Sequence, residues 1–266
     1  MPTKTLFASQ LKYWRQVQGI SQLSLATLAS TTTRHISFLE NGRSRPSGQM
    51  VIRLTEALEV PVRERNQLLK AAGYEGNYPE EEWGCETSTR FMKAIRYSLE
   101  AHAPFPAFVR NRYHEIVDLN EPARRLFSML EPNGLQTNLI EWILAPQSNA
   151  QHVFENFEAV AWGMVYRLRG EAAVAPHDKK LQELAHHAEL RSKNMQSAIP
   201  TKERVMCPVL LLEGQRISLM TLEAKFGSAQ DAGLDELRVE MMHPRDDVTE
   251  SFFRDLAKTP PLRLAR

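Results

Sequence analysis

Apolar residues recur at helical spacing through the first seventy or so residues of the chain. In segments 6–17, 22–29 and 33–40 they gather on one face, as expected of short amphipathic helices. After Pro46-Ser47 the apolar positions are four residues apart, and a last segment of this kind covers 63–72. Gly19, Asn41-Gly42 and Val60-Pro61 separate the segments. The pattern predicts five short helices in a compact all-α unit.

The second and third of these helices have the spacing of a helix-turn-helix, which holds two helices across a tight turn. Ala26 is small where the second helix would face the third, and Ile36 and Leu39 would point inward from the third. We expect Leu23 and Leu28 to supply the opposite wall. The outer face of the third helix is then free to enter a DNA major groove, where Thr and Arg side chains reach base edges.

The rest of the chain mixes helical and strand patterns. We expect a helix carrying Phe91, Ile95 and Leu99, two strands within 105–119, and helices at 120–130, 151–169 and 178–195. A short apolar segment at 139–144, a hairpin over 205–225, a strand at 237–242 and a helix at 248–256 complete the pattern. The predicted organisation is an all-α domain at 1–75, a linker at 76–87 containing three consecutive glutamates, and an α+β domain at 88–266.

Charge is divided unevenly along the chain. Residues 1–53 contain seven Lys and Arg against Glu40 alone, a net charge of +6, so the remainder carries −5 because the whole chain is +1. A basic end on an otherwise acidic chain favours a polyanion as the partner of that end.

The stretch from Gln22 to Gly42, with its closing Ile36-x-x-Leu39-Glu40-Asn41-Gly42 and the following Arg45-Pro46, resembles the XRE family, the Cro/phage-repressor-like helix-turn-helix regulators. The resemblance implies double-stranded DNA as partner and a buried ion pair between Arg15 and Glu40. The turn holds Ser30 where the family usually has Gly, which would strain a positive φ by roughly 1 kcal/mol. The implied DNA-binding residues are Gln22, Thr32, Thr33, Arg34, Ser37, Phe38, Asn41, Arg43 and Arg45; among them, Gln22, Asn41, Arg43 and Arg45 would contact phosphates.

The segment from about 88 to 258 resembles the ligand-binding domain of MmyB-like regulators, which has a PAS-like fold. The resemblance is carried by Phe105-Pro-Ala-Phe-Val, Ile116-Val-Asp-Leu-Asn120 and Thr221-Leu-Glu-Ala-Lys-Phe-Gly227. It implies a small apolar ligand such as a fatty acid. Candidate ligand contacts are Phe127, Trp142, Phe157, Trp162 and Met220, for each of which plain core packing is the alternative.

No phosphate-binding glycine loop, His-Glu-x-x-His, Cys-x-x-Cys or Gly-x-Ser-x-Gly motif occurs in the chain. We therefore expect no catalytic residues, metal site or cofactor. Two cysteines far apart, no secretory signal and no long apolar run predict a cytoplasmic protein without a membrane contact.

These observations together predict a DNA-binding transcriptional regulator that is a homodimer on a palindromic operator and is modulated by a small ligand. Two alternatives stay open: an enzyme with a helix-turn-helix regulatory module, and a constitutive DNA-binding dimer with no ligand. A cavity with convergent ionisable residues would favour the enzyme, and a closed or purely apolar one the regulator.

Overall fold

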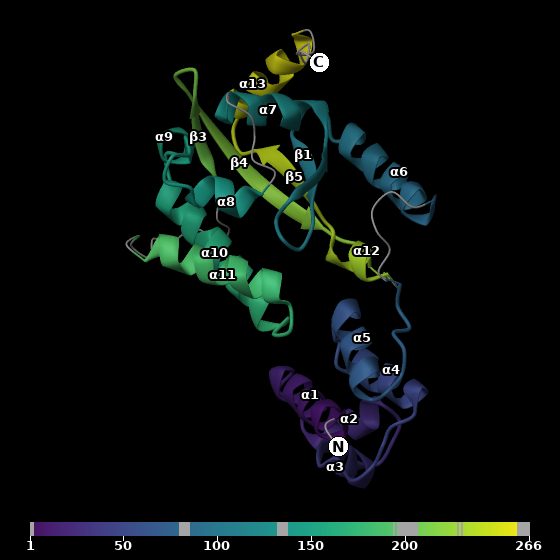
Figure 1. Ribbon diagram of the computed structural model, residues 1–266. Coiled ribbons are helices and arrows are strands. Elements are labelled where there is room, and N and C mark those ends of the chain that lie inside the picture. The colour runs from purple at the N-terminus through teal and green to yellow at the C-terminus, as the bar shows by residue number, and fades with distance from the viewer. Residues whose placement is uncertain are drawn as a thin grey trace. The chain divides into compact units, whose positions relative to one another are not determined.

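The computed structural model describes residues 3–79, 86–131, 138–193, 195, 207–227, 229 and 231–259 (Figure 1). The chain divides into two compact units. The helical unit comprises Met1–Trp83 together with Phe226–Asp235, and the sheet unit comprises Gly84–Lys225 and Glu236–Arg266. The expectation of an all-α domain followed by an α+β domain is confirmed.

Five helices form the N-terminal part of the helical unit, as predicted. They are α1 (Thr3–Val17), α2 (Gln22–Leu28), α3 (Thr33–Glu40), α4 (Gly48–Ala57) and α5 (Val62–Ala71). The hydroxyl groups of Ser21, Thr32 and Ser47 accept backbone N–H bonds at the starts of α2, α3 and α4. These side chains satisfy N–H groups that a helix cannot pair internally, which is why the helices begin where they do.

The inner faces of these helices meet in one hydrophobic core, in which Leu25, Ile36 and Leu39 are fully buried. The expectation for Leu23 and Leu28 is wrong, because their side chains are 65% and 61% exposed. Over a helix of two turns only one face can be inward, and Leu25, Ala26 and the following Ala29 occupy it.

Ser30 in the turn between α2 and α3 has a φ of 50°. The turn therefore requires the left-handed conformation, and Ser adopts it there at a cost of about 1 kcal/mol relative to Gly.

The sheet unit is built on a five-stranded antiparallel sheet of order β2-β1-β5-β4-β3. Its strands are β1 (Ala107–Arg110), β2 (Ile116–Leu119), β3 (Val209–Leu212), β4 (Gln215–Ala224) and β5 (Arg238–Pro244). Glu213 and Gly214 have positive φ values and join β3 to β4, which is the backbone geometry of a two-residue hairpin turn. The two predicted strand pairs and the last strand are confirmed, although residues 205 and 206 of the predicted hairpin lie outside the described residues.

Helices cover this sheet. They are α6 (Glu86–Ala101), α7 (Glu121–Leu130), α8 (Leu139–Leu144), α9 (Ala150–Val153), α10 (Phe157–Ala173), α11 (Lys179–Ser192) and α13 (Asp247–Lys258). Helices α8 to α11 lie together on one side of the sheet, and α7 and α13 lie together at one end (Figure 1). Their apolar faces and the sheet share one core.

The single helix predicted over 151–169 is instead two helices, interrupted between Phe154 and Asn156. Phe154 forms a bridge with Leu210 of β3, and the Asn156 side chain donates to the Cys207 carbonyl oxygen and accepts from the Val209 N–H. The interruption therefore satisfies backbone groups along β3, and this gain outweighs an unbroken helix.

The boundary between the predicted domains also differs from 75. Tyr78 is buried in the helical core, and the Asn66 amide bonds both its N–H and its carbonyl oxygen, so the chain up to this point belongs with the helices. Residues 80–85 of the predicted linker lie outside the described residues. A further short helix, α12 (Ala232–Glu236), was not predicted, and most of it belongs to the helical unit.

Candidate DNA interface and ligand cavity

The outer face of α3 carries the predicted base-contacting residues. Thr32 and Arg34 are exposed, while Thr33, Ser37 and Phe38 are half-buried. The Arg34 guanidinium lies 5.2 Å from the centre of the Phe38 ring, a cation–π contact that restricts the arginine while leaving its N–H donors free to point outward. Thr32 accepts a bond from the His35 N–H, so its hydroxyl oxygen is committed to starting the helix.

The predicted brace between the first and third helices is present. Arg15 Nε and Nη2 donate to the two Glu40 carboxylate oxygens at 2.6 and 2.9 Å, and Arg15 Nη1 donates to the Ile20 carbonyl oxygen. The hydrogen bond to Glu40 raises the pKa of Arg15, so the charge stays in place. Gln22 Nε2 also donates to Glu40, at 2.8 Å. Gln22 therefore has a structural contact. The second N–H of its amide group is left for the predicted phosphate contact.

The other predicted phosphate-contacting residues follow the end of α3. Asn41 Nδ2 donates to the Ser37 carbonyl oxygen and closes the last turn. Arg45 donates to the carbonyl oxygens of Ala72 and Gly73 after α5, and its guanidinium lies 5.4 Å from the Tyr74 ring centre. Arg45 therefore holds two parts of the unit together. Arg43 is exposed and makes no contact of this kind among the described residues.

Replacing Arg34 by alanine is expected to cost about 1–3 kcal/mol of binding free energy on the preferred DNA site and far less on random DNA. The reason is that an arginine at the leading turn of a groove-facing helix donates to base edges. Fluorescence anisotropy with the two duplexes measures the difference, and Lys12→Ala, an exposed cation on α1, is the matched control. An equal loss on both duplexes would make Arg34 a phosphate contact.

Replacing Arg43 by alanine is expected to weaken binding to every sequence and to lower the slope of log affinity against log salt by about 1. Arg43 suits this test better than Arg45, because Arg45→Ala also removes the bonds to the end of α5. Titrations at four salt concentrations give the slope, with Lys70→Ala as the control. If the slope does not change, Arg43 lies away from the phosphates.

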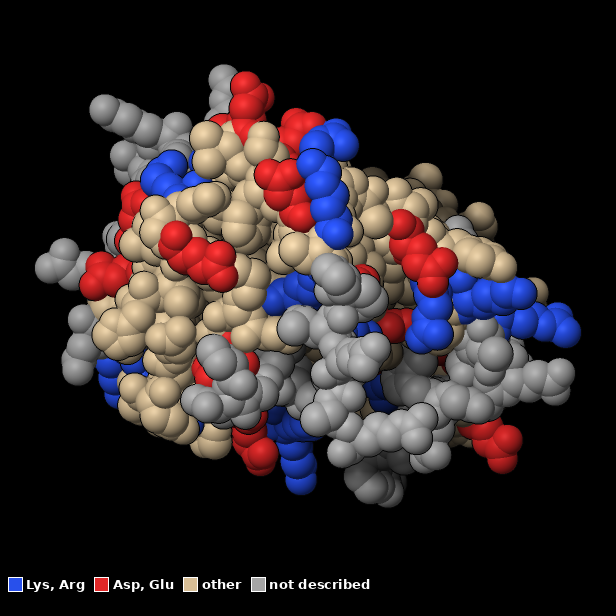
Figure 2. Space-filling model, turned by 90° about the horizontal axis from the view of Figure 1, so that it is seen from above, with Lys and Arg blue, Asp and Glu red and all other residues tan. Residues whose placement is uncertain are grey.

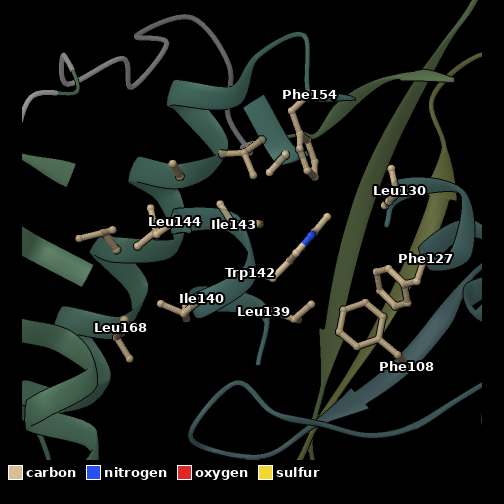
Figure 3. Packing of buried hydrophobic residues seen from close by; sticks show 14 of the residues in the cluster. Phe108, Phe127, Leu130, Leu139, Ile140, Trp142, Ile143, Leu144, Phe154 and Leu168 are labelled. Carbon is tan, nitrogen blue, oxygen red and sulfur yellow. The ribbon is translucent and has the colours of Figure 1, made fainter. Parts of the chain in front are cut away.

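A cavity of about 560 Å³ lies inside the sheet unit, between the sheet and helices α7, α8 and α10. Its size is typical of sites for small organic ligands. Phe127 and Trp142 of the predicted contacts line it, and Phe157, Trp162 and Met220 do not. In Figure 3, Trp142 projects from α8 toward the side on which Phe108, Phe127 and Leu130 lie. The larger depression of about 860 Å³ beside α13 is an open surface with several charged side chains.

Charged residues that the sequence pattern does not indicate form part of the cavity wall. Arg110 is 1% exposed; it donates to Glu240 at 2.9 Å, to Glu223 at 2.8 Å and to Glu171 at 3.3 Å. The only sequence signal for it is a charge at the end of an otherwise apolar strand. Arg167 reaches Glu223 and Glu240 from α10. The result is a cluster in which the buried Arg110–Glu240 pair is joined by the partly exposed Arg167, Glu171 and Glu223.

His114 joins this cluster through a 2.7 Å hydrogen bond from its Nε2 to Glu171. Burial lowers the pKa of His114, and the nearby Arg110 acts in the same direction, so the ring is neutral at pH 7. Although burial opposes it, the hydrogen bond with His114 and the charge of Arg110 hold the pKa of Glu171 below its usual value. Glu171 is therefore ionised, and a neutral imidazole donates to it.

Surface charge, metal-binding groups and membrane-spanning helices are the other features of the described residues that bear on function. Figure 2 shows a face on which acidic and basic side chains are interspersed, so the atoms drawn there form no continuous basic patch. No group of three or more His, Cys, Asp or Glu side chains in the described ranges could hold a metal ion. No helix among the same residues is long and apolar enough to cross a membrane.

Two family models show that the chain is a DNA-binding transcription regulator that carries a ligand-binding domain. A helix-turn-helix family model matches residues 11–65, and the model of the MmyB-like transcription regulator ligand binding domain matches residues 92–256. Because the second match covers more than half of the chain, the chain belongs to the family of MmyB-like transcription regulators. No curated protein matches the chain.

Proposed function

We propose that the chain regulates transcription as a homodimer on a palindromic operator, and that a small, largely apolar ligand in the cavity modulates its DNA affinity. The observation that carries the proposal is the combination, in one chain, of an exposed outer face on α3 with a cavity whose wall is mostly apolar. Dimerisation places two recognition helices on half-sites one helical turn of DNA apart, about 34 Å. A ligand acts by changing the population of the DNA-competent state.

The cavity favours an amphiphilic ligand with an acyl chain, of which a fatty acid is an example. Phe127, Trp142 and neighbouring aliphatic side chains suit the chain, and Arg167, whose side chain is 40% exposed, suits an acceptor head group. The hydrophobic effect supplies most of the affinity, and the cation fixes the orientation.

An enzyme remains the second candidate, because ionisable residues do converge on this cavity. Arg110 and His114 are, however, bonded to carboxylates rather than free to react. Thr221 and Tyr166 are the hydroxyl-bearing residues among the described lining residues, and neither has a hydrogen bond from a described side chain that would activate it. We therefore propose that the cluster shapes and neutralises one end of the cavity and that the domain binds its ligand unchanged.

The dimer contact requires exposed apolar side chains, and both units have them. The helical unit exposes Leu23 and Leu28. Tyr97 of α6 and Tyr166 of α10 also present large exposed apolar surfaces, at 60% and 69%. We keep the sheet unit as the proposed dimer surface, because α6 and α10 are the longer helices and offer more area.

Selection of duplexes from a random DNA pool with the full chain is expected to give a palindromic consensus. Sedimentation of the full chain is expected to show a dimer that Tyr97→Gln weakens and Leu28→Gln does not.

Native mass spectrometry of protein purified from cells is expected to show a bound small molecule, and chemical turnover of that molecule would favour the enzyme. A monomer on an asymmetric site would contradict the dimer, and a protein that retains no ligand and shows no thermal shift with fatty acids of 8–16 carbons would leave the constitutive alternative.

A further inference from the structure

The chain between strands β4 and β5 does not stay with the sheet that it connects. It leaves β4 after Ala224 and returns at Arg238, yet Phe226–Asp235 clusters with the helical unit. Ala232 in this segment is fully buried and belongs to the same hydrophobic core as α1 to α5. A part of the ligand-binding domain's own sequence therefore completes the core of the DNA-binding unit.

Two hydrogen bonds fix the segment to that unit. The Ala232 N–H donates to the Pro79 carbonyl oxygen at 3.0 Å, and Asp235 Oδ2 accepts from the Val62 N–H at 3.2 Å. Val62 is the first residue of α5, and the preceding Pro61 offers no capping side chain. Asp235 thus acts as the N-terminal cap of α5 from a position 173 residues later in the chain, and its negative charge suits the positive end of the helix.

The next residue, Glu236, is held within the sheet unit. Its carboxylate accepts from Arg112 Nη1, and Arg112 also pairs with Asp178 at 3.1 Å. Arg112 lies in the β1–β2 turn between Arg110 and His114, both of which line the cavity. One peptide bond, Asp235–Glu236, therefore joins a residue that caps α5 to a residue anchored beside the cavity wall.

The strands at both ends of the segment also belong to that wall. Leu219 and Thr221 of β4 and Glu240 and Met242 of β5 line the cavity. On the other side, α5 packs against α1 and α4, and α1 is tied to α3 by the Arg15–Glu40 pair. A continuous series of contacts therefore runs from the cavity through the segment to the recognition helix.

We propose that residues 231–236 transmit cavity occupancy to the DNA-binding unit, with the Asp235 cap on α5 as the contact that responds. This proposal rests on the proposed function above. A ligand that shifts β4, β5 or the β1–β2 turn changes the position of Glu236 and, through it, the hold of Asp235 on α5. Coupling between two sites is reciprocal, so DNA bound at α3 must in turn alter the strands that line the cavity.

Hydrogen exchange of the full chain, with and without a duplex selected from a random pool by the full chain itself, tests this reciprocity without requiring the cavity ligand. In the wild type, DNA is expected to slow exchange at least about threefold, not only in α3 and α5 but also in β4 and β5. In Asp235→Ala the effect is expected to remain in α3 and to disappear from the strands. Asp235→Asn, which keeps the capping oxygen, is expected to restore it, and Asp255→Ala on α13 is the matched control.

A second variant distinguishes loss of the coupling from loosening of α5, which Asp235→Ala could also cause. Glu236→Ala removes the oxygen that accepts from Arg112 while leaving the cap in place, so DNA affinity should stay within about twofold while the strand response is lost. Strand protection by DNA that is the same in Asp235→Ala and Glu236→Ala as in the wild type, or no strand response to DNA in the wild type, would overturn the proposal. Failure to select any duplex is a different result, because it removes the proposed function itself.

Discussion

Glu40→Ala is expected to lower the free energy of unfolding of the helical unit by about 3–5 kcal/mol, because it leaves Arg15 without its partner. The Glu40 side chain is 3% exposed and that of Arg15 is 13% exposed, so water can compensate the stranded guanidinium only in part. Three donors converge on the lost carboxylate, two from Arg15 and one from Gln22. Removing it breaks the contact between α1 and α3 and unpairs all three donors at once.

Chemical denaturation followed by helical circular dichroism measures the change, with DNA binding as a second readout. Glu56→Ala, an exposed carboxylate on α4, is the matched control and should change stability by less than about 0.5 kcal/mol. Glu40→Gln keeps two hydrogen-bonding atoms and should fall between the two. If Glu40→Ala and Glu56→Ala have the same free energy of unfolding, the ion pair orients α3 without stabilising the unit. In that case only the DNA affinity will change.

The helical domain could be predicted because its determinants are local. Each helix has its own cap and apolar stripe, as with Thr32 before α3 and the Ile36–Leu39 pair within it. The motif also placed Arg15 opposite Glu40, a contact across 25 residues that periodicity alone does not give. Leu23 and Leu28 could not be placed from sequence. A leucine side chain favours burial, and only the packing of α2 leaves these two exposed.

The features that sequence missed depend on distant partners. The break after Val153 needs the edge of β3 as a hydrogen-bonding partner, and the segment before β5 needs the free N-terminus of α5. Arg110 was not foreseen because its three carboxylate partners come from α10, β4 and β5. Two of the five predicted cavity residues line the cavity, since aromatic residues at helical spacing mark a core without telling where that core is hollow.

Arg110→Met is expected to destabilise the sheet unit by about 3 kcal/mol at pH 7, toward the lower end for a buried ion pair because Arg167 stays near Glu240. The Arg110 side chain is 2% exposed and that of Glu240 is 6% exposed, so the substitution leaves a buried carboxylate with one partly exposed partner. The substitution also removes from Glu171 the positive charge that, together with the hydrogen bond to His114, lowers the pKa of Glu171 against the effect of burial. In the wild type the pKa of Glu171 is depressed, so its stabilisation is present above its unfolded pKa and is lost as the pH falls through the folded value.

The gap in stability between wild type and Arg110→Met should therefore stay constant from pH 7 to about pH 5 and narrow from there to about pH 3.5, as Glu171 becomes protonated. Urea denaturation across this range measures it, and Arg167→Met, whose arginine is 40% exposed, should cost less than about 1 kcal/mol as the matched control. The double variant Arg110→Met with Glu240→Met should recover most of the loss, because two packed apolar side chains replace a buried pair at little net cost. A gap that stays constant with pH would mean that packing of the Arg110 stem, rather than its charge, holds β1 to β5.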